Sequence, residues 1–199
     1  GSDPNNPIRI LSVGRVVPKK GYEGLLKALS LLPSNLHWCF VHIGDGKNLS
    51  QLKILARQLE ISHCIKWLGA QPQEQVIKTY RESDIFVLNS RICDDGDRDG
   101  LPNVLMEAQS QRLACISSNV SAIPELITDT KTGYLIPHND PVSLADKIEY
   151  VIINQEERLS VAKKGELHVR AHFDLNQVIF KLSARFGIRK NELNQSILD

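Results

Sequence analysis

The chain has 199 residues, of which 42% are hydrophobic and 24% charged, and its formal net charge is +1 at pH 7. These values are typical of one globular domain with a full core, and the balanced charge gives no reason to expect a nucleic-acid partner. No apolar run approaches the roughly 18 residues that span a membrane, and no signal peptide is recognisable, so we expect a cytoplasmic protein.

Short apolar segments alternate with amphipathic ones along most of the chain. The apolar segments predict strands at 8–13, 38–43, 64–68, 84–88, 114–117 and 133–136. The amphipathic segments predict helices at 22–32, 49–59, 73–81, 101–110, 141–153, 155–172 and 175–186. Strands that are apolar throughout and alternate with helices are typical of a parallel sheet covered on both faces. We therefore predict a doubly wound, Rossmann-like α/β domain of about six strands.

The predicted domain spans residues 8–187. The polar segment 1–7 is expected to be a disordered linker or a remnant of an expression vector, and 188–199 a polar tail. In doubly wound sheets, ligands bind beyond the carboxyl ends of the strands. The loops that follow strands are therefore the places to look for a functional site.

The loop after the first predicted strand carries two candidate residues, Arg15 and Lys20, between Gly14 and Gly21. An arginine offers a bidentate fork to phosphate oxygens, and a lysine offers a point charge. Together they could bind a diphosphate and stabilise the negative charge that develops on a departing nucleoside diphosphate. The alternative is a pair of solvated surface cations.

The loop after the second predicted strand contains Gly44-Asp45-Gly46. It lacks the third glycine of a dinucleotide-binding fingerprint and follows the second strand rather than the first, which argues against NAD binding. A tight turn between strand and helix explains these glycines as well as a ligand contact does.

The most informative segment is 99–107, where Asp99 and Glu107 lie eight residues apart. Pro102 suits the first position of a helix, and the free amides and dipole of a helix start attract anions. Eight helical residues would separate the carboxylates by about 12 Å, near the length of a sugar–diphosphate–ribose unit. The segment predicts a nucleotide-sugar site, and the alternative is a capped helix with a solvated Glu107.

Metal and hydrolase chemistry find little support in the sequence. The six histidines are scattered, and the acidic run 94–97 lacks the glutamate that completes a calcium loop, so no metal is expected. The chain has no Gly-x-Ser-x-Gly elbow, which argues against a hydrolase. None of the four cysteines forms a CxxC pair, and we expect reduced, buried thiols at Cys39, Cys64, Cys93 and Cys115.

Taken in order, these segments resemble the C-terminal domain of retaining glycosyltransferases with the GT-B fold, in the group 1 (family four) class. The resemblance covers about residues 8–187 and rests on the segments 14–15, 20–21, 43–46, 67–69, 83–88, 99–107, 123–126 and 132–136. The loop at 95–102 is also similar to members that build exopolysaccharide or lipopolysaccharide.

The resemblance implies that Arg15 and Lys20 hold the donor diphosphate, Asp99 contacts the donor sugar and Glu107 binds the ribose. Backbone amides of 100–103 would meet the phosphate or sugar, and the base would lie near 68–70. The implied catalytic residues are Arg15, Lys20 and Asp99. The implied donor-binding residues are Gly14, Arg15, Lys20, Gly44, Gly46, Asp99, Gly100, Leu101, Pro102, Asn103 and Glu107.

The resemblance further implies transfer of a hexose, with retention and without metal or other cofactor, from a UDP- or GDP-sugar. The acceptor would be a polysaccharide, lipopolysaccharide or lipid-linked saccharide. Family enzymes carry an N-terminal acceptor-binding domain, and the resemblance of this chain is to the C-terminal domain, so we expect the acceptor-binding domain to be missing from this chain. We therefore expect a donor-binding half that is inactive alone, in a protein that associates peripherally with the inner face of the cell membrane through its full length.

Two departures from the family pattern keep other functions open. Asp99 stands where a glutamate is usual, and 119–122 lacks the glycine pair often found before the Pro-Glu at 124–125. The alternatives are a non-catalytic nucleotide-sugar-binding module and a GT-B-fold sugar-nucleotide epimerase. A dehydrogenase is the least favoured, because the dinucleotide fingerprint is missing.

Overall fold

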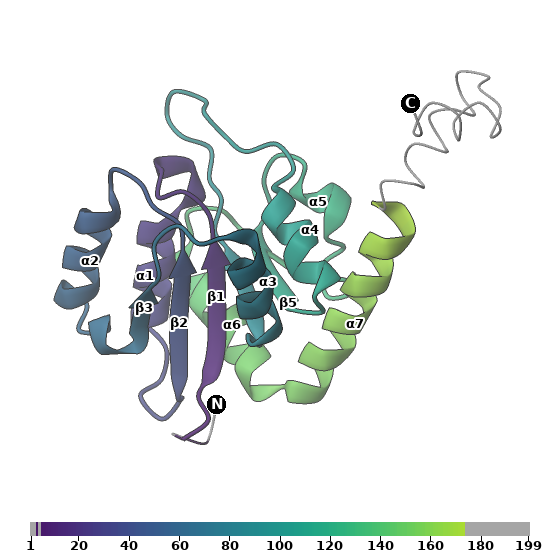
Figure 1. The fold of residues 1–199 in the computed structure, drawn as a ribbon, viewed down its shortest axis with the longest axis horizontal. Helices are drawn as coiled ribbons and strands as arrows, with labels where there is room; N and C mark the ends of the chain where they lie inside the picture. Colours follow the sequence, from purple (N-terminus) through teal and green to yellow (C-terminus); the bar gives the residue numbers. More distant parts are fainter. Residues whose placement is uncertain (1–2, 4, 174–199) are drawn as a thin grey trace.

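The protein is described by a computed structural model that covers residue 3 and residues 5–173. Its centre is a six-stranded sheet in the order β3-β2-β1-β4-β5-β6, in which every neighbouring pair is parallel (Figure 1). The strands are β1 (Ile8–Val13), β2 (Trp38–Ile43), β3 (Ile65–Trp67), β4 (Ile85–Leu88), β5 (Ala114–Ser118) and β6 (Tyr134–Ile136). This order confirms the predicted doubly wound α/β fold.

Seven α-helices of the described chain cover the two faces of the sheet. They are α1 (Tyr22–Ser30), α2 (Leu49–Gln58), α3 (Gln73–Arg81), α4 (Asn103–Ser110), α5 (Ile123–Leu126), α6 (Pro141–Ile153) and α7 (Gln155–His172). Two short 3₁₀ helices, η1 (Pro18–Lys20) and η2 (Ser62–Cys64), lie in the connections.

Successive strand residues point to opposite faces, so the sheet separates two hydrophobic clusters. Ile10 belongs to the cluster that also contains buried side chains of α1, α2 and α6. The adjacent Leu11 belongs to the other cluster, with side chains of α3, α4 and α5. All residues of β4 and β5 are buried, as expected for central strands covered on both faces.

The predicted elements within the described residues have the right type, and their ends coincide with the observed ends or differ by one or two residues. The short helix α5, which begins at Ile123, was not predicted, because four residues are too few to produce a helical periodicity. The helix predicted at 175–186 and the polar tail at 188–199 lie outside the described residues. The cysteines are all free, but only Cys115 is buried; Cys39, Cys64 and Cys93 are partly exposed, contrary to expectation.

The placement of Pro102 in the first turn of a helix was also wrong. Helical geometry is disfavoured at Leu101 because a proline follows it. The helix α4 begins only at Asn103. Pro102 is the N-cap residue, with extended φ and ψ of −72° and 118°. Asp99 thus lies four residues before α4 and Glu107 lies within it, so the helical rise does not give the distance between the two carboxylates.

The position of the candidate loops follows from the strand order. The chain leaves β1 toward β2 and later returns to β4 on the other side of β1, so the loops after β1 and β4 start side by side. Such a switch point opens a crevice at the carboxyl edge of a doubly wound sheet. The long connection from β4 to α4 rises above this edge in Figure 1.

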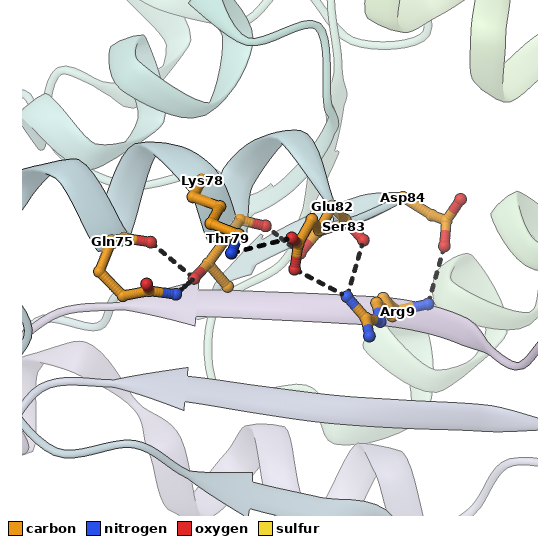
Figure 2. A network of polar contacts seen from close by, with 7 residues as sticks. All are labelled: Arg9, Gln75, Lys78, Thr79, Glu82, Ser83 and Asp84. Carbon is orange, nitrogen blue, oxygen red and sulfur yellow. Dashed lines mark hydrogen bonds and ion pairs between the residues drawn. The ribbon is translucent and has the colours of Figure 1, made fainter.

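A polar network at the opposite edge fixes α3 and β4 to β1 (Figure 2). The backbone N–H of Arg9 donates to Asp84 Oδ2 at 2.8 Å, and the Arg9 guanidinium pairs with Glu82 at 3.2 Å. The Ser83 hydroxyl donates to the carbonyl of Thr79 at 2.7 Å. Because Asp84 precedes β4, this network lies away from the ligand edge, and the role it gives Asp84 is structural.

Gly21 allows the loop after β1 to lie directly on the end of β4. Its φ is +62°, and a Cβ placed on it would lie 1.9 Å from the carbonyl oxygen of Asn89. The Asn89 side chain donates back to the Gly21 carbonyl at 3.1 Å. A residue with a side chain would therefore be strained by its backbone conformation and would also collide with backbone atoms.

We expect Gly21→Ala to lower the free energy of unfolding by about 2–4 kcal/mol, because left-handed strain and a backbone displacement add. Urea denaturation measures the change. Gly100→Ala is the matched control: a Cβ placed on Gly100 would have no atom within 4 Å, and we expect a change below about 0.5 kcal/mol. Equal stabilities of the two variants would contradict the close approach.

Candidate functional site

The loops after β1 and β4 are linked by side-chain and backbone contacts. Lys19 pairs with Asp97 at 2.9 Å and Lys20 with Asp99 at 2.8 Å. The N–H of Arg91 donates to the Lys19 carbonyl at 2.8 Å, and its guanidinium Nε donates to the carbonyl of Pro18 at 2.9 Å. The segment 91–99 therefore lies along η1, and it brings two of the predicted site residues into direct contact.

The Lys20–Asp99 pair is largely shielded from solvent, with side chains 13% and 15% exposed. The hydroxyl of Ser90 donates to the same carboxylate oxygen, Oδ2, at 3.2 Å. Ser90 is itself fixed, because its carbonyl accepts a hydrogen bond from the buried Ser118 hydroxyl at the end of β5. The carboxyl ends of β4 and β5 thus hold Asp99 in place against Lys20.

Arg15 extends from the same loop but is exposed, and it forms no ion pair with another described residue. The backbone around it is well fixed. The N–H of Gly14 donates to the Ile43 carbonyl and that of Val16 to the Asp45 carbonyl, both at 2.9 Å. A rigid loop with an exposed guanidinium leaves Arg15 available to an anion.

The glycines after β2 have a clear packing role. Gly44 has a φ of +140°, and a Cβ on it would lie 2.0 Å from the Gly14 carbonyl oxygen. A Cβ on Gly46 would lie 2.4 Å from the Val16 carbonyl oxygen. The glycines therefore let the loop after β2 support the loop of Arg15, and a donor contact by Gly44 or Gly46 stays a prediction.

Glu107 lies on α4 and is held by a tyrosine of α3. The hydroxyl of Tyr80 donates to Glu107 Oε2 at 3.1 Å, and Tyr80 is 1% exposed. Burial, reinforced by the charge of Glu107, raises the pKa of Tyr80 well above its usual value, so the hydroxyl stays protonated. Glu107 is exposed and keeps its other oxygen, Oε1, available.

Sequence reasoning did not identify Tyr80 as part of the site. In the sequence it is one more large side chain on an amphipathic segment, which is the pattern of a core residue. Only the contact between α3 and α4 shows that its hydroxyl serves Glu107.

The N-terminal end of α4 carries a partial positive charge that no side chain of its cap or first turn compensates. Pro102 provides no side-chain hydrogen bond to the first turn, and that turn contains no acidic residue. The free N–H groups and the dipole therefore remain available to an anion. Gly100 and Asn103 are exposed beside this helix end, whereas Pro102 is buried and Leu101 partly buried.

The turn after β3, at 68–70, adjoins the same edge of the sheet. The N–H of Gly44 donates to the carbonyl of Gly69 at 2.8 Å, which joins this turn to the loop after β2. Leu68 is 39% exposed and so offers apolar surface there. This surface is compatible with the predicted base contact, which stays a prediction.

A buried histidine lies beneath these loops, near the end of β2. His42 is 0% exposed, and its ring centroid lies 4.7 Å from that of Tyr22 and 5.4 Å from that of Trp67. Neither ring nitrogen has a hydrogen-bond partner among the described residues. Burial lowers the pKa of His42 to about 4, so the ring is neutral at pH 7.

Within residues 3 and 5–173, no group of three or more His, Cys, Asp or Glu side chains is arranged to hold a metal ion. In the same part of the chain, no helix has the length and apolar character needed to cross a membrane.

Comparison with known proteins identifies a family. The family model described as glycosyl transferases group 1 matches residues 2–168. The amylovoran biosynthesis glycosyltransferase AmsK of Erwinia amylovora is 39% identical over 143 residues, which are 71% of this chain and 35% of AmsK. The chain thus spans about a third of that relative's length.

Solved structures share the fold. The C-terminal domain of the glycosyl transferase group 1 family protein LpcC from Francisella tularensis has a TM-score of 0.76 and 24% identity, over 86% of this chain and 89% of that domain. Anabaena HepE, solved in complex with UDP and glucose, has a TM-score of 0.80 and 17% identity, over 92% of this chain and 48% of HepE. The chain thus matches most of the LpcC domain and about half of HepE.

The depressed pKa of His42 predicts loss of stability in acid. Between about pH 6.5 and 4 the unfolded chain binds a proton at this histidine and the folded chain does not, so stability falls as the pH is lowered through this window, by up to about 3 kcal/mol. Urea denaturation across this range measures the loss. His42→Gln should reduce it, whereas the exposed control His63→Gln should leave it unchanged; equal profiles for all three proteins would contradict the assignment.

Proposed function

Because the chain belongs to the group 1 glycosyltransferases, we propose that its crevice binds the nucleotide-sugar donor of such an enzyme. One observation carries the proposal: Lys20, in contact with Asp99, lies at the switch point of the sheet, where the connection to α4 and its Glu107 begins. A cation for phosphate and two carboxylates for hydroxyl groups are the chemistry that a sugar nucleotide requires.

The diphosphate would bind to Lys20, Arg15 and the amides at the start of α4. Two cations and a positive helix end stabilise the negative charge that grows on the nucleoside diphosphate as the bond to the sugar breaks. In the donor complex these groups would already contact the diphosphate, so little reorganisation would be needed when the charge develops. Arg15 and Lys20 thus act on the leaving group, and no metal ion is required.

The ribose would bind to Glu107. A carboxylate accepts hydrogen bonds from the two hydroxyl groups of a ribose, and the bond from Tyr80 fixes its orientation. All common nucleotides carry this ribose, so Glu107 does not choose between a uridine and a guanosine donor. The base would rest near 68–70.

The hexose would bind to the carboxylate of Asp99, which Lys20 and Ser90 hold through Oδ2 in the ligand-free chain. Transfer would proceed with retention to a polysaccharide, lipopolysaccharide or lipid-linked acceptor. The relative AmsK, which is named as a glycosyltransferase of amylovoran biosynthesis, supports a role in sugar transfer. The acceptor site would lie on a second domain, so this chain alone should bind the donor and transfer poorly.

We expect isothermal titration calorimetry to detect binding of UDP or GDP and of UDP-glucose or GDP-mannose to the chain. Glu107→Ala should weaken that binding about 10- to 100-fold, which is the effect of losing charge-assisted hydrogen bonds. Glu149→Ala, on α6 and outside the crevice, is the matched control and should bind like the parent. No binding of any of these ligands to the parent chain would overturn the proposed function.

The role of Tyr80 can be tested separately from folding. Tyr80→Phe removes only the hydroxyl that orients Glu107, and we expect it to weaken binding of a nucleoside diphosphate about 3- to 10-fold. Binding of inorganic pyrophosphate, which has no ribose, should not change.

Tyr150→Phe is the control for Tyr80→Phe. Tyr150 also donates to a glutamate, Glu157, but between α6 and α7. Tyr150→Phe should leave the affinities for the nucleoside diphosphate and for inorganic pyrophosphate unchanged. A parallel loss of nucleotide and pyrophosphate binding in Tyr80→Phe would indicate a general structural defect instead.

A further inference from the structure

We propose that Asp99 makes the site discriminate against the bare nucleoside diphosphate, by competing with phosphate for Lys20. The inference rests on the proposed function and concerns the release of the diphosphate product, which the donor-binding roles alone do not describe. A transferase must hold its donor and then release the diphosphate that shares most of the donor's contacts. The ion pair in the ligand-free chain provides a way to do both.

In the ligand-free chain, the charge of Lys20 is already compensated. Its Nζ lies 2.8 Å from Asp99 Oδ2, and both side chains are at least four-fifths shielded from water. Ser90 adds a second donor to the same oxygen at 3.2 Å, so the carboxylate is held by two groups. Lys20 is therefore not a free cation waiting for phosphate.

The position of Asp99 is set by the loop around it. The Lys19–Asp97 pair and the two hydrogen bonds of Arg91 fix the segment 91–99 along η1. Asp99 is thus held in contact with Lys20 by a chain segment anchored at several points, and the pair re-forms whenever nothing else occupies either partner.

A bare nucleoside diphosphate meets two unfavourable alternatives. Its phosphate either displaces Asp99 from Lys20, which leaves a shielded carboxylate without its cation, or it binds beside the carboxylate and is repelled by it. Repulsion between two anions at such short range is strong where water is excluded. Both alternatives weaken the binding of the bare diphosphate.

An intact sugar nucleotide removes this conflict. The hydroxyl groups of its hexose donate hydrogen bonds to Asp99, so the carboxylate has new partners when it leaves Lys20. Lys20 is then free to bind the diphosphate. Once the hexose has been transferred, Asp99 loses those partners and returns to Lys20, which favours release of the product.

The test is the affinity of Asp99→Asn for bare diphosphates. Calorimetry with UDP, GDP and inorganic pyrophosphate should show binding about 5- to 10-fold tighter than in the parent, because Lys20 has lost its competing carboxylate. Binding of UDP-glucose or GDP-mannose should not become tighter, since the contact to the hexose is lost as well. The ratio of donor to diphosphate affinity should therefore fall at least about 5-fold.

Asp94→Asn is the matched control. Asp94 is exposed in the same loop and takes no part in the contacts to Lys20, and its replacement changes the net charge by the same amount. We expect its affinities to stay within about twofold of the parent.

The measured affinities distinguish failure of this inference from failure of the proposed function. If the parent binds nucleoside diphosphates and Asp99→Asn binds them equally or more weakly, the competition is refuted and the donor site stands. A tightening of equal size in Asp94→Asn would assign the effect to net charge and also refute the competition. If neither the parent nor Asp99→Asn binds any nucleotide or pyrophosphate, the proposed function falls, and this inference falls with it.

Discussion

The rest of the structure depends on a reversal in the order of strands. The chain first builds the sheet outward from β1 to β3 and then continues on the other side of β1 with β4. This reversal makes two loops of different chemistry start from neighbouring strands at the carboxyl edge. The loop after β1 is basic and short, and the loop after β4 is long and acidic. Two ion pairs, Lys19–Asp97 and Lys20–Asp99, and the hydrogen bonds of Arg91 join the two loops.

The electrostatics of the crevice are therefore local. A net charge of +1 creates no long-range attraction for an anion, and the cations nearest the sheet are already paired. Arg15 and the start of α4 remain without an anionic partner in the described chain. A ligand gains most if it brings phosphate to these groups and hydroxyl groups to Asp99 and Glu107 at the same time, which is the combination present in a sugar nucleotide.

Much of the fold could be predicted from the sequence because its strands are covered on both faces. Such strands are continuous apolar runs, and they alternate with amphipathic helices clearly enough to identify six strands and the loops that follow them. The start of α4 could not be placed correctly, because a proline is compatible with both the N-cap and the first helical position, and only the extended backbone of Pro102 in the structure shows that it is the N-cap residue.

The candidate site was harder to predict than the fold, because its contacts join residues that are distant in the sequence. Lys20 and Asp99 were both identified, yet their pairing depends on the order of strands. Tyr80 was missed because its chemical role comes from Glu107, 27 residues away on another helix. Gly44 and Gly46 were interpreted either as features of a turn or as ligand contacts, and the carbonyl groups of a neighbouring loop, which exclude a Cβ at both positions, could not be recognised from the sequence.

The central claim is that this crevice holds a nucleotide sugar, with Lys20 turned from Asp99 to phosphate. The most direct measurement is a crystal structure of the chain with a bound sugar nucleotide, UDP-glucose or GDP-mannose. The account predicts a phosphate oxygen within hydrogen-bonding distance of Lys20, the ribose at Glu107, and Asp99 in contact with the hexose instead of Lys20. A sugar nucleotide bound elsewhere on the chain, or bound in the crevice with the Lys20–Asp99 pair intact, would contradict it.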